Sequence, residues 1–283
     1  MKKKFNYNNN KASLYIIPTP IGNLDDMTYR AVKVLRQVDL VLAEDTRVTR
    51  KLFNHYKIST QLESFHDFNE EKKINNIVEN LASGIDIGLV SDAGMPLISD
   101  PGYKLVRKLF ELDFNIIALP GSNALLPALV MSGLKTQPFI FLGFLDSKKT
   151  KRLETISKLK YYPETLIFYE SIHRIKEMLK DLYNVLGDRS FSIIREISKT
   201  HEEIISGNLS EYNNLIKLKG ELVVVIEGYS EEIINSDLTI VEQVDYFIRQ
   251  GFKKIEAMKK VSQMTNIPKN KIYQDYLNEK IKE

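Results

Sequence analysis

The sequence predicts an α/β protein with two βα-built domains and a short all-helical segment at its end. Between residues 13 and 122, short apolar runs are each followed by a loop and an amphipathic stretch with helical spacing. This pattern is typical of βα units around a mostly parallel sheet. Apolar runs and helical stretches alternate again between residues 123 and 230, whereas the last 45 residues show helical periodicity only.

The stretch 85–102 organises the first domain. Residues 85–90 are mostly apolar and predict a buried strand. Residues 93–96, Ala-Gly-Met-Pro, then form a stiff turn, because glycine leaves the backbone bare and proline fixes φ. Asp100 is expected to cap the next helix, with Pro101 at its first position. Ligands bind at such loops in open α/β sheets, although a tight βα connection without a ligand is the alternative.

The other elements follow in order. In the first domain, strands are expected at 14–17, 40–43, 58–63 and 116–119, with helices from Thr28, after Arg47 and near 71–83. The loop at 120–123 then opens a helix at Ala124, where the second domain begins. In the second domain, strands are expected at 139–142, 165–169, 191–195 and 221–226, with an extended segment near 202–206 and helices at 148–160 and 173–186. The predicted parts are a disordered tail at 1–12, α/β domains at 13–122 and 123–230, and a helical unit at 236–283.

The helical unit begins with a capping box at Thr239-Ile240-Val241-Glu242, and Gly251 is expected to close its first helix. Two further helices around the turn at 265–268 resemble a helix-turn-helix that would contact nucleic acid. The alternative is a plain helical cap on the second domain. Its contacts there would come from Val241, Val244, Phe247 and Ile248.

Composition excludes several classes of site. The 283 residues include no cysteine, so disulfides and thiol chemistry are impossible, and the four histidines show no metal-ligand spacing. The uncharged stretch 114–134 contains Pro120, Gly121 and Pro127, so a strand, a turn and a helix explain it better than a membrane span. Because the start of the chain lacks the apolar core of a signal peptide, we expect a cytoplasmic protein without a membrane segment. The absence of cysteine and the spacing of the histidines lead us to expect no metal.

Basic charge is concentrated in particular segments. Residues 147–160 hold five Lys and one Arg against one Glu, and residues 251–283 hold eight Lys against four acids, although the whole chain carries only +3. Basic patches on an acidic remainder favour a polyanionic partner. The alternative is a set of ordinary solvated lysines.

Three loops, at 18–23, 91–96 and 120–123, share one design: each follows a buried strand and combines Gly with Pro or small polar residues. A wound sheet would bring them to one edge. The chain has neither a Gly-x-x-x-x-Gly-Lys-Ser/Thr nor a Gly-x-Gly-x-x-Gly run. The loops therefore favour a ligand that is held by backbone groups and has little phosphate.

Five segments carry a resemblance to known proteins. They are Thr19-Pro20-Ile21-Gly22-Asn23-Leu24-Asp25-Asp26-Met27-Thr28, Ala43-Glu44-Asp45-Thr46-Arg47, Ser91-Asp92-Ala93-Gly94-Met95-Pro96, Ser99-Asp100-Pro101-Gly102 and Phe168-Tyr169-Glu170-Ser171-x-His173-Arg174. Together they closely resemble the ribosomal RNA small subunit methyltransferase I family of the tetrapyrrole methylase superfamily. The resemblance runs in order from about residue 14 to 228, and the helical tail is similar as well.

The resemblance implies two αβα domains of the tetrapyrrole methylase type, with S-adenosylmethionine in the cleft between them, and a homodimer. It also implies 2′-O-methylation of a cytidine ribose in the decoding region of 16S ribosomal RNA, either free or in the 30S particle. One departure is Pro-Gly-Ser-Asn-Ala at 120–124, which keeps the small Gly121 and Ala124. The expected cofactor contacts are Pro20, Ile21, Gly22, Asp92, Gly94, Met95, Gly121, Ser122, Asn123, Ala124 and Tyr169.

Methyl transfer to a ribose hydroxyl needs a group that accepts the hydroxyl proton, together with alignment of oxygen, methyl and sulfur. The candidate acceptors at strand ends are Glu44, Asp45, Asp92, Asp100, Glu170 and Lys199. An ion pair with Arg174 is the alternative role for Glu170. The candidate RNA contacts are Arg47, Arg50, Lys148, Lys149, Lys151, Arg152 and Arg174.

Two other functions remain open at this point. One is a tetrapyrrole methylase with the same fold and cofactor, although it would not need basic segments. The other is an RNA-binding protein that keeps the cofactor pocket but has no activity. Cofactor binding and methyl transfer to ribosomal particles would separate the three.

Overall fold

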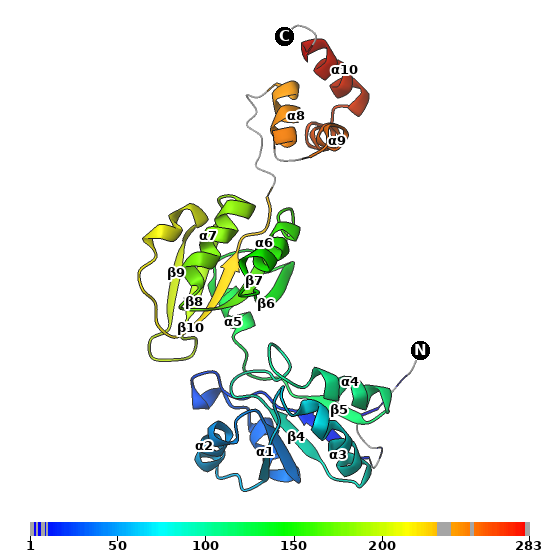
Figure 1. Cartoon of the computed structure of the whole chain (residues 1–283), viewed down its shortest axis with the longest axis vertical. Coiled ribbons are helices and arrows are strands. Elements are labelled where there is room, and N and C mark those ends of the chain that lie inside the picture. Colours follow the sequence, from blue (N-terminus) through cyan, green and yellow to red (C-terminus); the bar gives the residue numbers. More distant parts are fainter. Residues whose placement is uncertain are drawn as a thin grey trace. The chain divides into compact units, whose positions relative to one another are not determined.

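The computed structural model describes residues 3, 5, 6, 9, 11–230, 239–249 and 252–280. The chain folds into two compact units, Met1–Tyr229 and Ser230–Glu283. The first unit contains two β-sheets with their helices, and the second contains helices α8, α9 and α10 (Figure 1).

The first sheet is fully parallel, with strand order β3-β2-β4-β1-β5. Its strands are β1 (Ser13–Ile16), β2 (Leu40–Ala43), β3 (Gln61–Ser64), β4 (Ile87–Val90) and β5 (Asn115–Ala118). Every residue of β2 and β4 is buried, as expected for central strands covered on both faces. Because the strands run in one direction, the loops that follow them gather at one edge. The prediction of a mostly parallel sheet is confirmed.

Helices cover both faces of this sheet. They are α1 (Tyr29–Gln37), α2 (Thr46–Tyr56), α3 (Glu70–Ala82) and α4 (Tyr103–Glu111). The short helix η1 (Leu24–Asp26), in the connection before α1, has no buried residue. Alternate side chains of β2 pack on opposite sides: Leu42 joins the core under α3 and α4, and Val41 joins the core under α1 and α2. The first domain is therefore a three-layer αβα sandwich.

The start of α4 differs from the prediction that Asp100 caps it. The N-cap is Gly102, whose φ of +124° favours glycine, and no side chain caps the helix. Leu97 and Ser99 also have positive φ, so the chain at these positions is an irregular loop and not yet a right-handed helix. Asp100 consequently remains in the loop.

The second sheet is mixed, with strand order β6-β7-β10-β8-β9. Only the β6–β7 pair is parallel; β10 runs antiparallel to both β7 and β8, and β9 runs antiparallel to β8. The strands are β6 (Phe139–Phe144), β7 (Thr165–Ser171), β8 (Ser190–Arg195), β9 (Glu203–Asn208) and β10 (Glu221–Ile226).

Helices cover both faces of the second sheet as well. Helices α6 (Lys149–Lys158) and α7 (Ile175–Leu186) and the short η2 (Leu209–Asn214) lie over one core, to which they contribute residues such as Ile156, Leu179 and Leu209. Helix α5 (Leu125–Met131) lies over the other core through Ala128 and Leu129. The predicted fold class, two αβα domains and a helical unit, is confirmed.

The C-terminal unit has a core of its own. Helices α8 (Ile240–Arg249), α9 (Lys254–Thr265) and α10 (Lys269–Lys280) bury Val244, Phe247, Met258, Val261 and Ile272 against one another. The capping box at the start of α8 is confirmed, because Thr239 N donates to Glu242 Oε2 at 2.7 Å and Glu242 N donates to Thr239 Oγ1 at 3.3 Å. Gly251, expected to close α8, lies outside the described residues.

The segment predicted to be a disordered tail makes defined contacts with the first sheet in its described part. Asn6 Nδ2 donates to Ile116 O at 3.0 Å, and Asn9 exchanges hydrogen bonds of 2.7 and 2.8 Å with the buried Asn115. These contacts tie described parts of the segment to β5. In the described part of the chain, no helix is both long and apolar enough to cross a bilayer.

Candidate functional site

Three loops meet at the carboxyl edge of the first sheet. Thr19 and Gly94 exchange two backbone hydrogen bonds of 2.9 Å, which join the loop after β1 to the loop after β4. The loop after β5 packs directly on the first, because a Cβ on Gly121 would lie only 2.9 Å from Pro18 Cβ. The predicted convergence of the three loops is confirmed.

A cavity of about 590 Å³ lies between these loops and the second sheet. Of the expected cofactor residues, Ile21, Gly94, Met95, Asn123, Ala124 and Tyr169 line it. Sequence reasoning missed several other residues that the second domain and the loop before α4 contribute. They include Ile98, Phe141, Phe144, Gly220 and Val223. In the sequence, aromatic and β-branched residues on strands indicate only a packed core, so no local signal identified them.

The lining of this cavity is apolar, aromatic and acidic. The ring of Tyr169 lies 4.8 Å from that of Phe141 and 5.6 Å from that of Phe144, centroid to centroid, both edge to face. Among the described residues, the charged side chains that line the cavity are Asp100, Glu170 and Glu221. Such a lining suits a flat apolar group and a cationic group, and it is unfavourable for phosphate.

The remaining expected cofactor residues lie elsewhere. Pro20, Gly22 and Asp92 line a second, smaller cavity of about 270 Å³. Gly121 lies in the packed contact between loops, and Ser122 Oγ donates to Asp26 O at 3.0 Å. The expected cofactor residues therefore fall into three groups. Some line the larger cavity, some line the smaller cavity, and the others lie in contacts that hold the loops together.

Three carboxylates form an acidic group at the carboxyl edge of the first sheet. Burial, followed by the negative charge of Glu44, raises the pKa of Asp100 to about 6, although a hydrogen bond with Ser91 opposes the shift. Burial is also the main cause that raises the pKa of Glu44, and the charge of Asp92 adds to it. Asp92 itself has a raised pKa, mainly through burial. Asp100 is the member that lines the larger cavity, so it is the best placed proton acceptor.

Asp45 is not suited to accept a proton. It is the N-cap of α2, where its Oδ1 accepts from Arg47 N at 2.8 Å, and Arg47 Nη2 donates to its Oδ2 at 2.6 Å. The side-chain hydrogen bond from Arg47 is the main cause that lowers the pKa of Asp45 to about 2. A carboxylate with this pKa is a weak base, so its role is to begin the helix.

Lys199 joins the two domains and is also a poor base. Its Nζ contacts Glu196 Oε1 at 2.9 Å and Glu221 Oε2 at 3.0 Å. Burial lowers the pKa of Lys199, but the hydrogen bonds with Glu196 and Glu221 outweigh it, and the net shift is upward. The Lys199 side chain also fills the space beside Gly22, where a Cβ would overlap Lys199 Cγ. We therefore regard Lys199 as a cation that packs two elements together.

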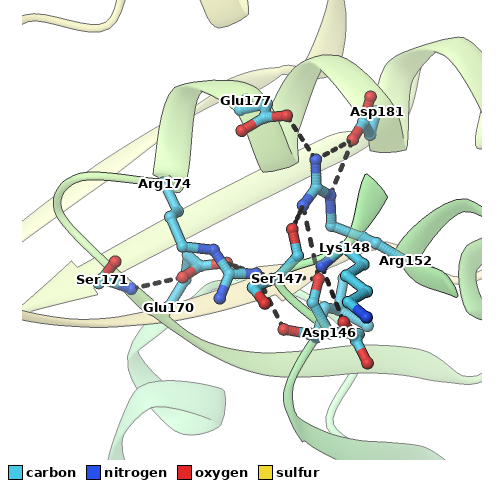
Figure 2. Close-up of polar contacts among 10 residues, drawn as sticks. Asp146, Ser147, Lys148, Arg152, Glu170, Ser171, Arg174, Glu177 and Asp181 are labelled. Atoms are coloured by element: carbon cyan, nitrogen blue, oxygen red, sulfur yellow. Dashed lines mark hydrogen bonds and ion pairs between the residues drawn. The ribbon is translucent and has the colours of Figure 1, made fainter. Parts of the chain in front are cut away.

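Glu170 and Arg174 form an internal contact (Figure 2). Glu170 Oε1 accepts from Ser171 N at 2.7 Å, and its buried Oε2 lies 3.5 Å from Arg174 Nη2. Arg174 Nη2 also donates to the carbonyl oxygens of Leu145 and Asp146, at 2.9 and 3.2 Å. The expectation that Glu170 accepts a proton is therefore not favoured, and the alternative ion-pair role describes it better. The side chain of Arg174 is 30% exposed, but these contacts already engage its guanidinium.

The prediction that Arg152 contacts RNA is wrong. Its guanidinium is buried and donates to Asp181 from Nε at 2.8 Å and to Glu177 from Nη2 at 2.7 Å (Figure 2). Nη1 donates to Ser147 O at 3.2 Å. With its donors engaged on α7 and on the loop before α6, the side chain cannot reach a phosphate. The neighbouring Lys148 and Lys149 are exposed, so they remain available to RNA.

Arg47 and Arg50 lie on the exposed surface of α2. The side chain of Arg47 is 87% exposed even though it pairs with Asp45. A surface pair of this kind is weak, so a phosphate could replace Asp45 as its partner. Among the described residues, no group of three or more His, Asp or Glu side chains could hold a metal ion.

Comparisons with known proteins agree with this geometry. Residues 13–213 match the family described as Tetrapyrrole (Corrin/Porphyrin) Methylases. The chain is 43% identical over 281 residues to the ribosomal RNA small subunit methyltransferase I of Bacillus subtilis, and this alignment covers 96% of each protein. It is 41% identical over 286 residues to the protein of the same name from Halalkalibacterium halodurans, over 98% of this chain and 99% of that protein.

Solved structures show the same fold. A cobalt precorrin-4 methyltransferase superposes with a TM-score of 0.57 at 18% identity, over 76% of this chain and 94% of that chain. A diphthine synthase gives 0.59 at 11% identity, over 77% and 90% of the chains. The uroporphyrin-III C-methyltransferase of Thermus thermophilus, complexed with S-adenyl homocysteine, gives 0.54 at 15% identity, over 76% and 97%.

Proposed function

Because the chain belongs to the tetrapyrrole (corrin/porphyrin) methylases, and among them to the ribosomal RNA small subunit methyltransferase I family, we propose that it methylates ribosomal RNA with S-adenosylmethionine. The proposed acceptor is the ribose 2′-oxygen of a cytidine in the decoding region of small-subunit RNA. The proposed substrate is this RNA, free or in the 30S particle, and the proposed enzyme is a cytoplasmic homodimer.

The acidic, aromatic lining of the larger cavity is the observation that carries the proposal. S-adenosylmethionine combines a flat adenine with a sulfonium cation, and it has no phosphate. Phe141, Phe144 and Tyr169 supply an aromatic wall, while Asp100 and Glu221 supply negative charge. The bare backbone at Gly94 leaves room for close approach, and 590 Å³ is within the usual size of a ligand site.

The same lining argues against a tetrapyrrole substrate. Porphyrin precursors carry several carboxylates, and these would be repelled by acidic side chains. Ribosomal RNA needs only one ribose near the cavity, because its phosphates can lie on exposed cations such as Lys148, Lys149 and Arg50. The fold allows both substrates, so the argument rests on the charges of the site.

The residues of the chain have two tasks in this reaction. When bound, S-adenosylmethionine supplies an activated methyl group. The chain must hold the ribose hydroxyl in line with that methyl group and accept the hydroxyl proton. We assign proton acceptance to Asp100, because its pKa of about 6 leaves it ionised at neutral pH while making it a stronger base than an ordinary aspartate. Glu44 and Asp92 contribute negative charge that keeps this pKa high.

Transfer of tritium from methyl-labelled S-adenosylmethionine tests the proposal. The acceptors are free 16S RNA, 30S subunits and 70S ribosomes from a strain that lacks the modification, with a porphyrin precursor as the competing substrate. Nuclease digestion and chromatography should recover the label in 2′-O-methylcytidine. Label on a base, or on the porphyrin alone, would contradict the proposal.

A variant of the cofactor loop completes the test. Gly94 has a φ of +80°, and its Cβ position lies 3.4 Å from Ile21 Cγ2, so Gly94→Val should distort the cavity wall. We expect calorimetry to detect loss of S-adenosylmethionine binding in a protein that remains folded. As a matched control, Gly84→Val also replaces a positive-φ glycine, but at a position with open space around it.

A further inference from the structure

The smaller cavity, of about 270 Å³, is separate from the larger one. The two cavities share no lining residue, and neighbouring residues of the same loops face different cavities. Pro20 and Gly22 line the smaller and Ile21 the larger; Asp92 lines the smaller and Gly94 the larger. The paired loops are therefore a partition between the two spaces.

The walls of the smaller cavity are apolar and fixed. Leu24 of η1 and Val48 of α2 line it and stay 41% and 39% exposed, and the half-buried Leu52 lies one helical turn after Val48. Tyr56 at the end of α2 donates its hydroxyl to Leu24 O, and Arg36 Nη2 donates to Tyr56 O at 2.6 Å. The first bond joins η1 to α2 and the second joins α1 to α2, so both fix the position of the helix that carries Val48 and Leu52.

The polar groups around this cavity match a nucleotide. Asp92 Oδ1 accepts from Asp45 N at 3.0 Å, and in the described part of the chain its second oxygen has no hydrogen-bond partner. A carboxylate oxygen can accept from an exocyclic amino group such as that of cytosine. Lys51 lines the cavity and is exposed, and Arg47 and Arg50 lie beside it on α2. Cations at the rim suit phosphates, and an apolar slot suits a base.

We propose that the smaller cavity binds one unstacked base of the RNA substrate. The base lies between Leu24 and Val48, Asp92 accepts from its amino group, and the flanking phosphates lie on Arg47, Arg50 and Lys51. This inference rests on the proposed function, because it assigns the substrate-binding site of the same reaction. It explains why Pro20, Gly22 and Asp92 face away from the larger cavity.

Filling the cavity tests this assignment. Val48→Trp places a large side chain at a partly exposed helix position, so the fold should tolerate it. The matched control is Asn54→Trp, at an exposed position of the same helix that does not line the cavity. We expect Val48→Trp to lower the affinity for 30S subunits by about 5- to 150-fold, which corresponds to loss of one stacked base. Its affinity for S-adenosylmethionine should stay within about twofold of that of Asn54→Trp.

A crosslink gives a second readout that does not depend on the bulky substitution. The chain contains no cysteine, so Val48→Cys creates a unique thiol for a photoreactive benzophenone label. Val48→Cys should crosslink to the RNA within a few nucleotides of the methylated cytidine, as mapped by primer extension. Asn54→Cys with the same label should not crosslink there.

The outcomes separate the two proposals. If the wild-type protein methylates no RNA, both the proposed function and this inference are overturned. If the wild type methylates RNA but Val48→Trp and Asn54→Trp bind 30S subunits equally, this inference alone is overturned. A crosslink from residue 48 to RNA far from the methylated cytidine would also overturn it.

Discussion

Replacing Arg152 with Met should destabilise the second α/β domain without removing an RNA contact. The side chains of Arg152 and Asp181 are each 2% exposed, and the guanidinium contacts Asp181 Oδ2 from two nitrogens, at 2.7 and 2.8 Å. Met fills much of the same volume but leaves the Asp181 carboxylate buried without its cation. Removal of one partner from a buried pair costs about 3–5 kcal/mol.

The size of the effect follows from burial. The contact of Arg152 with Glu177 adds little, because that carboxylate is 57% exposed and water can replace the cation. A loss of about 3–5 kcal/mol is a large share of the stability of about 5–15 kcal/mol typical of a domain. For a unit of the size of residues 1–229, each kcal/mol shifts the melting temperature by about 2–4 °C, so the expected decrease is about 6–20 °C.

Thermal and urea unfolding, followed by circular dichroism, measure the effect. Lys149→Met on the exposed side of the same helix is the control, and it should change stability by no more than about 0.5 kcal/mol. The double variant Arg152→Met/Asp181→Leu removes both charges and should recover most of the loss, because apolar replacements of a buried pair are often neutral. Equal melting of Arg152→Met and Lys149→Met, or no recovery in the double variant, would refute this reasoning.

Three further predictions concern activity. Because Asp100 must be ionised to accept a proton, kcat/KM should rise with pH up to about 6 and then level off. Asp100→Asn should lower kcat about 100-fold and remove the rise of kcat/KM near pH 6, whereas a pH profile unchanged in the variant would exclude this role. Replacement of Lys148, Lys149 and Lys151 by Gln should reduce the salt slope of RNA binding by roughly 0.7–0.9 per lost phosphate contact, at unchanged melting temperature, whereas an unaltered slope would identify them as solvated lysines. A chain that ends at Tyr229 should fold and bind S-adenosylmethionine but methylate RNA with a higher KM and similar kcat; a lower melting temperature with unchanged KM would instead assign residues 230–283 a stabilising role.

The sequence by itself determined the elements and their order. Apolar runs such as 40–43 and 85–90 are short and are followed by loop residues, which favours buried strands over helices. The switch to helical periodicity after residue 230 marks a separate core. The capping box at Thr239 is equally local, since both of its hydrogen bonds join residues three apart. Glycine and proline after buried strands likewise indicated the loops that form the site.

Only the tertiary structure decided what each side chain faces. Arg152 lies among lysines in the sequence, but packing of α6 on α7 places it opposite Asp181, and this contact joins residues 29 positions apart. Asp100 followed by Pro101 is typical of a helix start, yet α4 begins only after Gly102. Asp100 therefore stays in the loop, where it lines the cavity. Pro20 and Ile21 are adjacent in the chain but line different cavities. Burial, pKa and ligand contacts depend on partners distant in sequence, and local propensity carries no information about such partners.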